Sequence, residues 1–201
     1  MPFVYTDIYV RGQIAHIDVL TALFNCLTRI QKNQATAALQ RWFGDATPAW
    51  QKIVVGHLTK MRSIVNLQDV PIGFMDLKER NVRTNAAALP GSLTSIVPGS
   101  STNYKGRNVL LDVAFKTKPA LLPLAGGLID ASAYNQSKFE TLIHELSHAI
   151  LSTNDEKLVS GKEAYGSKRA LKLVTENIAL AKTNAENWGI FVEACGVRNT
   201  S

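Results

Sequence analysis

The sequence predicts a mainly helical α+β fold in a single domain. A chain of 201 residues with 46% hydrophobic content can bury one ordinary core. Apolar residues recur at helical spacing in the first and last thirds of the chain, whereas Pro, Gly, Ser, Asn and Thr interrupt the middle. We therefore expect one domain over residues 1–201, with helices in 14–66, a small irregular sheet and loops in 67–136, and further helices in 137–196.

Two helices are expected in the N-terminal third. From Ile14 to about Leu39 the apolar residues follow a 3.6-residue period, which predicts one long helix. Gly44 is typical of a helix end. Pro48, directly after Thr47, is typical of a first helical residue and predicts the start of the second helix there.

The middle of the chain favours short strands. Val70 to Met75 and Leu93 to Val97 are candidates, and Asn108 to Phe115 is the better one because its apolar run is longer. Ser100 to Asn103 has the composition of a loop.

A third helix is expected at about 137–151. Ser137 is a candidate N-cap, and Glu140 three residues later completes a capping box. Apolar residues then recur along one face of the helix. Two more helices are predicted at roughly 166–182 and 183–195.

The third helix carries the motif His144-Glu145-Leu146-Ser147-His148. Histidines four residues apart lie on one face of a helix, one turn apart, so that both rings can bind one metal ion. Glu145 can then reach a water molecule on that ion. This H-E-x-x-H pattern is typical of zinc metallopeptidases. The alternative is a buried helix whose two histidines make only structural hydrogen bonds.

A third protein ligand is expected, because catalytic zinc sites usually have three. The candidates that follow in sequence are the carboxylates Asp155, Glu156, Glu163 and Glu176. Asp155 follows a Ser/Thr/Asn cluster that predicts a turn after the helix, from which it could fold back onto the metal. Glu176 lies on a later predicted helix, as the glutamate ligand of gluzincins does. The residues alone leave this choice open.

Several segments together resemble the aspzincins, which include the deuterolysins and the lysine-specific (peptidyl-Lys) metalloendopeptidases. These are Thr141 to His148, Thr153-Asn154-Asp155, Tyr165-Gly166 and Asn184-Ala185-Glu186-Asn187-Trp188. The resemblance runs from about residue 37 to 193 and is dense after 137. It implies a zincin-like fold with one catalytic Zn²⁺ on His144, His148 and Asp155.

The same resemblance implies roles for other residues. Glu145 is the expected general base, Tyr165 the expected oxyanion donor, and Glu186 the expected substrate-binding carboxylate for a cationic side chain; the alternative for Glu186 is a solvated helix glutamate. The chain departs from the family pattern in three ways. Ten residues separate Asp155 from Tyr165, as if 156–164 were an insertion, Glu186 replaces an aspartate, and Gly189 replaces the second acid of the lysine-specific members.

Composition restricts the partners and the location. The net charge of +6 is spread along the chain without a basic run, which argues against nucleic acid, and no apolar stretch is long enough for a membrane span. The N-terminus has no signal-peptide pattern. We nevertheless expect a protein that is secreted or delivered outside the producing cell, with an effector toxin as one form of this. Cys26 and Cys195 could form a disulfide or remain two buried thiols.

The sequence therefore predicts a zinc metalloendopeptidase of the aspzincin type that acts on proteins or peptides. Two alternatives remain. One is a zincin-fold binding protein with little catalytic turnover, and the other is a gluzincin-type peptidase with Glu176 as the third ligand.

Overall fold

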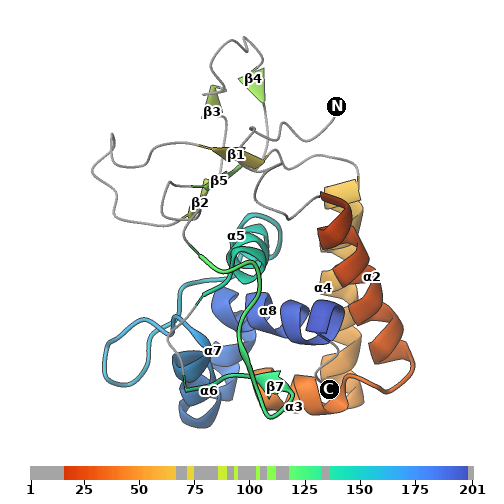
Figure 1. Ribbon diagram of the computed structural model, residues 1–201, viewed down its shortest axis with the longest axis vertical. Helices are drawn as coiled ribbons and strands as arrows, with labels where there is room; N and C mark the ends of the chain where they lie inside the picture. Colours follow the sequence, from red (N-terminus) through yellow and green to blue (C-terminus); the bar gives the residue numbers. More distant parts are fainter. Residues whose placement is uncertain are drawn as a thin grey trace.

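The computed structural model describes residues 16–66, 118–132 and 136–198, together with five short strands between residues 72 and 111. Helices form most of the described part of the chain, and a small sheet lies against one of them (Figure 1). The predicted mainly helical α+β class, with a small sheet before the motif-bearing helix, is confirmed.

The N-terminal part contains α2 (His16–Gln31), α3 (Thr36–Phe43) and α4 (Pro48–Asn66). The predicted single helix from 14 to 39 is wrong, because α2 ends at Gln31. Asn33 adopts a left-handed backbone (φ 57°), and the chain turns before α3 begins. Gly44, also left-handed at φ 67°, ends α3 as predicted.

The start of α4 agrees with the sequence prediction. Pro48 is its first residue, and the Thr47 hydroxyl accepts a hydrogen bond from the Trp50 backbone N–H at 3.3 Å. One buried face of α4 packs into the core through Trp50, Val54, Leu58, Met61 and Val65.

Three of the short strands form one sheet in the order β1-β5-β2. β1 (Ile72–Phe74) runs parallel to β5 (Asn108–Leu111), and β2 (Ala86–Leu89) pairs with β5 in the antiparallel sense. A separate pair joins β3 (Leu93–Thr94) to β4 (Asn103–Tyr104). Each of the three predicted strands has a described part, in β1, β3 and β5. The remaining residues of each predicted range lie outside the described residues, as do residues 100–102 of the predicted loop.

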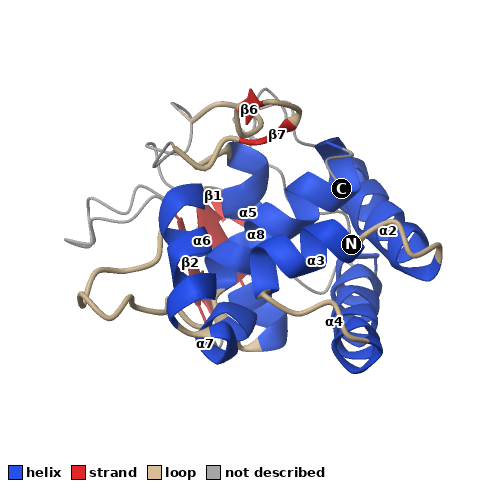
Figure 2. Cartoon of the chain, turned by 90° about the horizontal axis from the view of Figure 1, so that it is seen from below, coloured by secondary structure: helices blue, strands red, loops and turns tan. Residues whose placement is uncertain are grey.

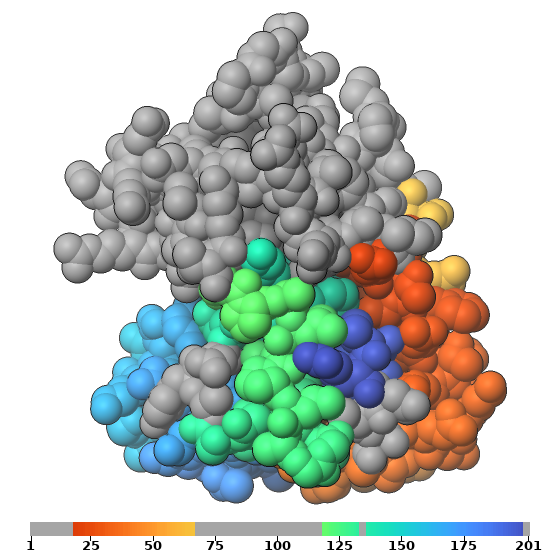
Figure 3. Space-filling view, in the orientation of Figure 1, coloured from red at the N-terminus to blue at the C-terminus, as the bar shows by residue number. Residues whose placement is uncertain are grey.

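The segment 118–132 connects this region to the motif helix. It lies on the surface of the face shown in Figure 3, where it is green, and contains the hairpin of β6 (Leu124–Ala125) and β7 (Leu128–Ile129). Leu122 and Ile129 are buried, which anchors both ends of this hairpin to the core.

The motif lies on α5 (Lys138–Leu151), near the centre of the molecule (Figures 1 and 2). Ser137 caps α5 as predicted, because its hydroxyl accepts a hydrogen bond from the Glu140 N–H at 2.9 Å. The second half of the expected capping box is not formed, since the Glu140 side chain turns toward Thr141 and His144 instead. Both β2 and β5 pack against α5.

The C-terminal part contains α6 (Ser167–Glu176), α7 (Ile178–Thr183), α8 (Ala185–Val192) and the π-helix η3 (Glu193–Arg198). The predicted helix over 166–182 is interrupted at Asn177, whose backbone is extended and whose side chain caps α7 by accepting from the Leu180 N–H at 3.2 Å. α8 packs along α5 and contributes Trp188 and Phe191 to an aromatic cluster around Phe43, with ring centroids 4.9 and 5.1 Å from Phe43.

The two cysteines meet where α2 packs against η3. Cys26 and Cys195 are both buried and free, and they are close enough that each thiol affects the pKa of the other. The helices approach closely because Gly196 has no side chain: a Cβ at this position would lie 2.4 Å from the Ala22 carbonyl oxygen. Of the helices that the structure describes, none combines the length and the apolar character of a membrane span.

Candidate metal centre

Helix α5 places the two histidines of the motif beside each other. His144 and His148 are one turn apart, with their ring centroids separated by 4.7 Å and their Nε2 atoms by 3.1 Å. His144 is almost fully buried, whereas His148 is partly exposed. Both Nε2 atoms therefore face one point at the edge of the core.

Asp155 reaches the same point from the loop that follows α5. Its Oδ1 lies 3.1 Å from His144 Nε2 and 3.2 Å from His148 Nε2. Ser152 ends the helix in a left-handed conformation, which reverses the chain. Asn154 then holds the loop against the start of α8, since its N–H donates to the Thr183 carbonyl and its carbonyl accepts from Ala185 N–H, both at 2.9 Å.

These three atoms fit a tetrahedral zinc ion. Zinc bonds of about 2.0–2.1 Å hold neighbouring ligand atoms roughly 3.3 Å apart, close to the sides of this triangle. Two imidazole nitrogens and one carboxylate oxygen are also a common zinc ligand set. Burial acts to raise the pKa of Asp155, but hydrogen bonds from His144 and His148 outweigh it and hold that pKa well below its ordinary value. The carboxylate is therefore available as a charged ligand.

The other nitrogen of each histidine is fixed by an acceptor. His148 Nδ1 donates to the Thr153 carbonyl at 2.7 Å, and His144 Nδ1 lies 3.0 Å from Glu186 Oε2. Such partners set the tautomer and the orientation of a metal-binding imidazole. Both rings are thereby held with Nε2 toward the metal position.

Glu145 lies next to this triangle on α5. Its Oε1 is 4.0 Å from His144 Nε2, and the side chain is 8% exposed. A carboxylate in this position can accept a proton from a water molecule that occupies the open side of the triangle.

Tyr165 is brought to the site by a hairpin, which accounts for the long spacing in the sequence. Backbone bonds join Ala164 N–H to the Glu156 carbonyl and Leu158 N–H to the Lys162 carbonyl, both at 2.9 Å. Residues 156–164 thus form a closed loop whose two ends lie together. The Tyr165 hydroxyl is close enough to Asp155 to act on the pKa of its carboxyl group, and the Tyr165 ring centroid lies 5.8 Å from that of His144. Burial and the Asp155 carboxylate raise the pKa of Tyr165, so it remains a neutral donor.

Glu186 is fully buried beneath His144, at the start of α8. One oxygen faces His144 Nδ1 and accepts from Gln136 Nε2, each at 3.0 Å, and the other accepts from the Gly166 N–H. Burial acts to raise the pKa of Glu186, but the bond with His144 lowers it below its ordinary value. A substrate side chain would have to displace these partners, so this geometry gives Glu186 the position of a residue that orients His144.

A second buried carboxylate, Glu140, was not expected at the site. It lies on α5 one turn before His144, fully buried, and forms a close group with His144 and Glu186. Burial, and then the neighbouring Glu186, raise the pKa of Glu140 well above its ordinary value. The sequence feature that could have indicated a buried Glu140 is Gly189 on α8, where a Cβ would lie 2.9 Å from Glu140 Oε1.

The remaining acidic candidates lie apart from the histidines. Glu176 Oε2 accepts from the Val159 N–H at 2.9 Å, and its other oxygen is 3.4 Å from the Lys172 ammonium. Glu156 accepts from the Thr183 hydroxyl at 2.8 Å, and Glu163 is part of the hairpin through its bridge to Lys157. The geometry brings together Asp155, and not Glu176, with the two histidines.

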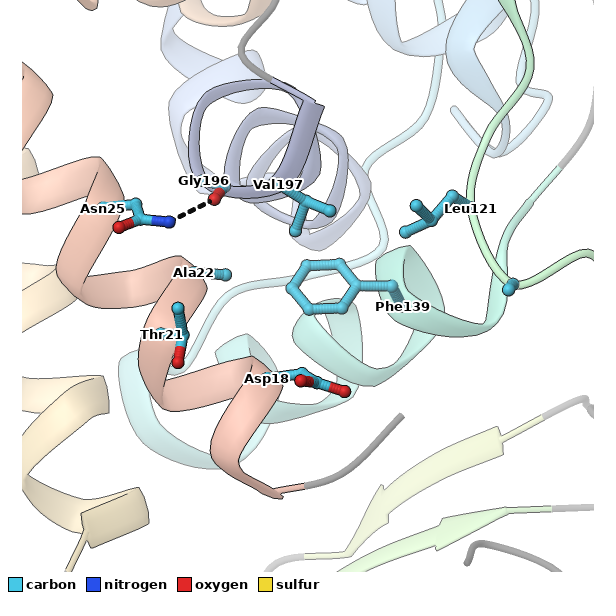
Figure 4. A pocket seen from close by; sticks show the side chains of 9 residues that line it. Asp18, Thr21, Ala22, Asn25, Leu121, Phe139, Gly196 and Val197 are labelled. Carbon is cyan, nitrogen blue, oxygen red and sulfur yellow. Dashed lines mark hydrogen bonds between the residues drawn. The ribbon is translucent and has the colours of Figure 1, made fainter. Parts of the chain in front are cut away.

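A pocket of about 460 Å³ lies elsewhere on the molecule, between α2, η3 and the start of α5. Figure 4 shows Phe139 facing Val197 across it, with Asp18 and Thr21 on the α2 side. Its lining residues include none of the predicted site residues.

Comparison with known proteins bears on the fold. No protein-family model matches the chain, and no curated protein sequence matches it. Its structure is similar to that of a zinc peptidase from Grifola frondosa, with a TM-score of 0.53 and 20% sequence identity, over 89% of this chain and 94% of the other. The chain therefore has the fold of a zinc peptidase.

Proposed function

We propose that this protein is a zinc-dependent endopeptidase of the aspzincin type. The observation that carries the proposal is the convergence of His144 Nε2, His148 Nε2 and Asp155 Oδ1 within 3.2 Å of one another, with Glu145 beside them. The fold shared with the Grifola frondosa zinc peptidase supports it. Proteins or peptides are the proposed substrates.

The roles of the side chains follow from their positions. Zinc on these three ligands would supply Lewis-acid chemistry, lowering the pKa of a water molecule and polarising the peptide carbonyl. Glu145 takes a proton from the attacking water and passes it to the leaving amine nitrogen. Tyr165 donates its hydroxyl proton in a hydrogen bond to the carbonyl oxygen as negative charge develops there.

Glu186 is a positioning residue in this proposal. It holds the ring of His144 from the side opposite the metal position, as carboxylates do in many zinc sites. The Gly166 N–H and the Gln136 amide in turn hold Glu186. The mechanism therefore depends on buried hydrogen bonds that connect α5, α8 and Gly166, the residue that follows Tyr165.

The direct test of the reaction is Glu145→Gln, assayed on casein with zinc content measured in the same preparation. We expect zinc to be retained and cleavage to fall by at least about 100-fold, the contribution typical of a general base. The exposed Glu163→Gln is the matched charge control and should retain activity. If Glu145→Gln cleaves casein at the wild-type rate, the proposed mechanism is wrong. If wild type binds zinc without cleaving protein, the chain is a zincin-fold binding protein instead.

A further inference from the structure

Lys118 places an ammonium group against the first turn of α5. Its Nζ donates to Gln136 Oε1 and to Thr141 Oγ1, each at 2.7 Å, and the side chain is partly buried. Both of these acceptors are neutral. A lysine held in this way has given up much of its hydration, so other negative charge must compensate.

Acidic side chains act in this direction. Burial lowers the pKa of Lys118, and Glu140, Glu186 and Glu145 oppose that effect electrostatically without cancelling it. The Thr141 hydroxyl, which accepts from Lys118, in turn donates to Glu140 Oε2 at 3.4 Å. Glu140 Oε1 is buried, and no hydrogen-bond donor among the described groups reaches it.

Hydrogen bonds link the Lys118 position to the metal centre. Thr141 lies one helical turn before Glu145 on α5. Gln136 Nε2 donates at 3.0 Å to Glu186 Oε2, the same oxygen that faces His144 Nδ1. Lys118 therefore holds a positive charge two hydrogen bonds away from the carboxylate that orients His144.

Gly189 explains how the Glu140 carboxylate fits between α5 and α8. A Cβ at position 189 would lie 2.6 Å from the Glu140 carbonyl oxygen and 2.9 Å from Glu140 Oε1. The absence of a side chain on α8 therefore provides the space that the Glu140 carboxylate fills.

We propose that Lys118 is the resident occupant of a cation-binding site beside the metal centre, and that it excludes cationic substrate side chains from this position. The proposed exclusion of cationic substrates rests on the proposed peptidase function. The proposed cation site does not, because it concerns only the binding of an ammonium group by Gln136, Thr141 and the nearby carboxylates.

Chemical rescue tests the cation site without any catalytic assay. Lys118→Ala removes three carbons and the ammonium, which n-propylammonium replaces atom for atom. We expect millimolar n-propylammonium to raise the melting temperature of Lys118→Ala, whereas 1-propanol at equal concentration and ionic strength does not. Wild type and the control Lys172→Ala, whose ammonium is on the surface, should not respond to either compound. Equal responses to amine and alcohol in Lys118→Ala would overturn the proposal.

Two additions keep this test decisive. In the Lys118→Ala background, Thr141→Val removes one acceptor at nearly constant volume and should weaken the apparent amine affinity about 10-fold, as expected for a hydrogen bond to a charged group. An unchanged affinity would contradict the proposed site. If Lys118→Ala does not fold in buffer, its refolding yield with propylammonium against propanol becomes the readout, and equal yields count against the proposal.

Cleavage of paired peptides tests the exclusion of cations. The peptides carry either lysine or its uncharged isostere norleucine next to the cleaved bond. Wild type should not prefer lysine, whereas Lys118→Ala should gain a preference of about 10-fold in kcat/KM. The same ratio in both proteins would refute the exclusion. If neither protein cleaves any peptide while the amine rescue succeeds, the proposed peptidase function fails and the cation site stands.

Discussion

Glu193 gives a quantitative prediction about stability near the metal helix. This residue begins η3 with no exposed surface, and its two oxygens accept from the Leu122 N–H and the Ser137 hydroxyl. It therefore links the segment before α5 to the residue that caps α5. Burial raises the pKa of Glu193 to about 7, although the bonds with Ser137 and Leu122 act in the opposite direction.

The sign and size of the effect follow from this pKa. In the unfolded chain the carboxyl titrates near its ordinary value of 4.5, so between pH 4.5 and 7 only the folded state retains the proton. The stabilisation is complete below pH 4.5 and is lost as the pH rises through about 7. At 1.36 kcal/mol for each tenfold change in proton affinity, the loss amounts to about 3 kcal/mol.

Urea unfolding of wild type and Glu193→Gln from pH 4 to pH 8 measures this effect. The difference in unfolding free energy between the two proteins isolates Glu193, because the other titrating groups are common to both. We expect wild type to lose about 3 kcal/mol relative to Glu193→Gln over this range. A difference that stays constant with pH, or that changes in favour of wild type as the pH rises, would refute the reasoning. The exposed Glu163→Gln is the charge control.

Three further predictions concern the site and the core. Glu186→Gln should weaken zinc binding by about 10- to 100-fold in a chelator competition, because an amide offers one acceptor oxygen to the donors around it; wild-type affinity would contradict its positioning role. Tyr165→Phe should lower kcat by about 100-fold with zinc content unchanged, and an unchanged kcat would exclude it as an oxyanion donor. Diamide should join Cys26 to Cys195 and raise the melting temperature, as mass spectrometry and thermal unfolding would show; no crosslink would mean that the thiols are kept apart.

The sequence predicted helix ends well where the signal was local. Gly44, Pro48 and Ser137 each act through their own backbone or side-chain chemistry, and each ends or begins a helix as expected. The two missed breaks both occur at asparagines, Asn33 and Asn177. Asparagine tolerates turn conformations without requiring them, so a periodic apolar pattern continued across both positions.

The site residues likewise differ in whether nearby residues in the sequence are enough to predict their positions. His144 and His148 could be predicted because helical spacing alone brings them together. The choice of Asp155 depends on contacts with distant residues, chiefly the bonds of Asn154 to Thr183 and Ala185, which a pattern of nearby residues does not contain. The contact between Asp155 and Tyr165 likewise depends on a hairpin closed by backbone hydrogen bonds.

Glu140 was misinterpreted for a physical reason. Its place three residues after Ser137 fits a capping box, and helix capping alone would account for a glutamate at this position. The structure instead turns its side chain into the core, toward the space above Gly189. A glycine within a helix is a signal of close approach, but only the packing of α8 on α5 identifies which residue approaches.

Zinc stoichiometry is the measurement that tests the central claim most directly. Native mass spectrometry of wild type, Asp155→Ala and Glu176→Ala, each loaded with zinc and then exposed to a moderate chelator, counts the ions retained by each chain. We predict one zinc per chain in wild type and in Glu176→Ala, and none in Asp155→Ala. Retention by Asp155→Ala together with loss from Glu176→Ala would contradict the proposed ligand set and favour a gluzincin-type site.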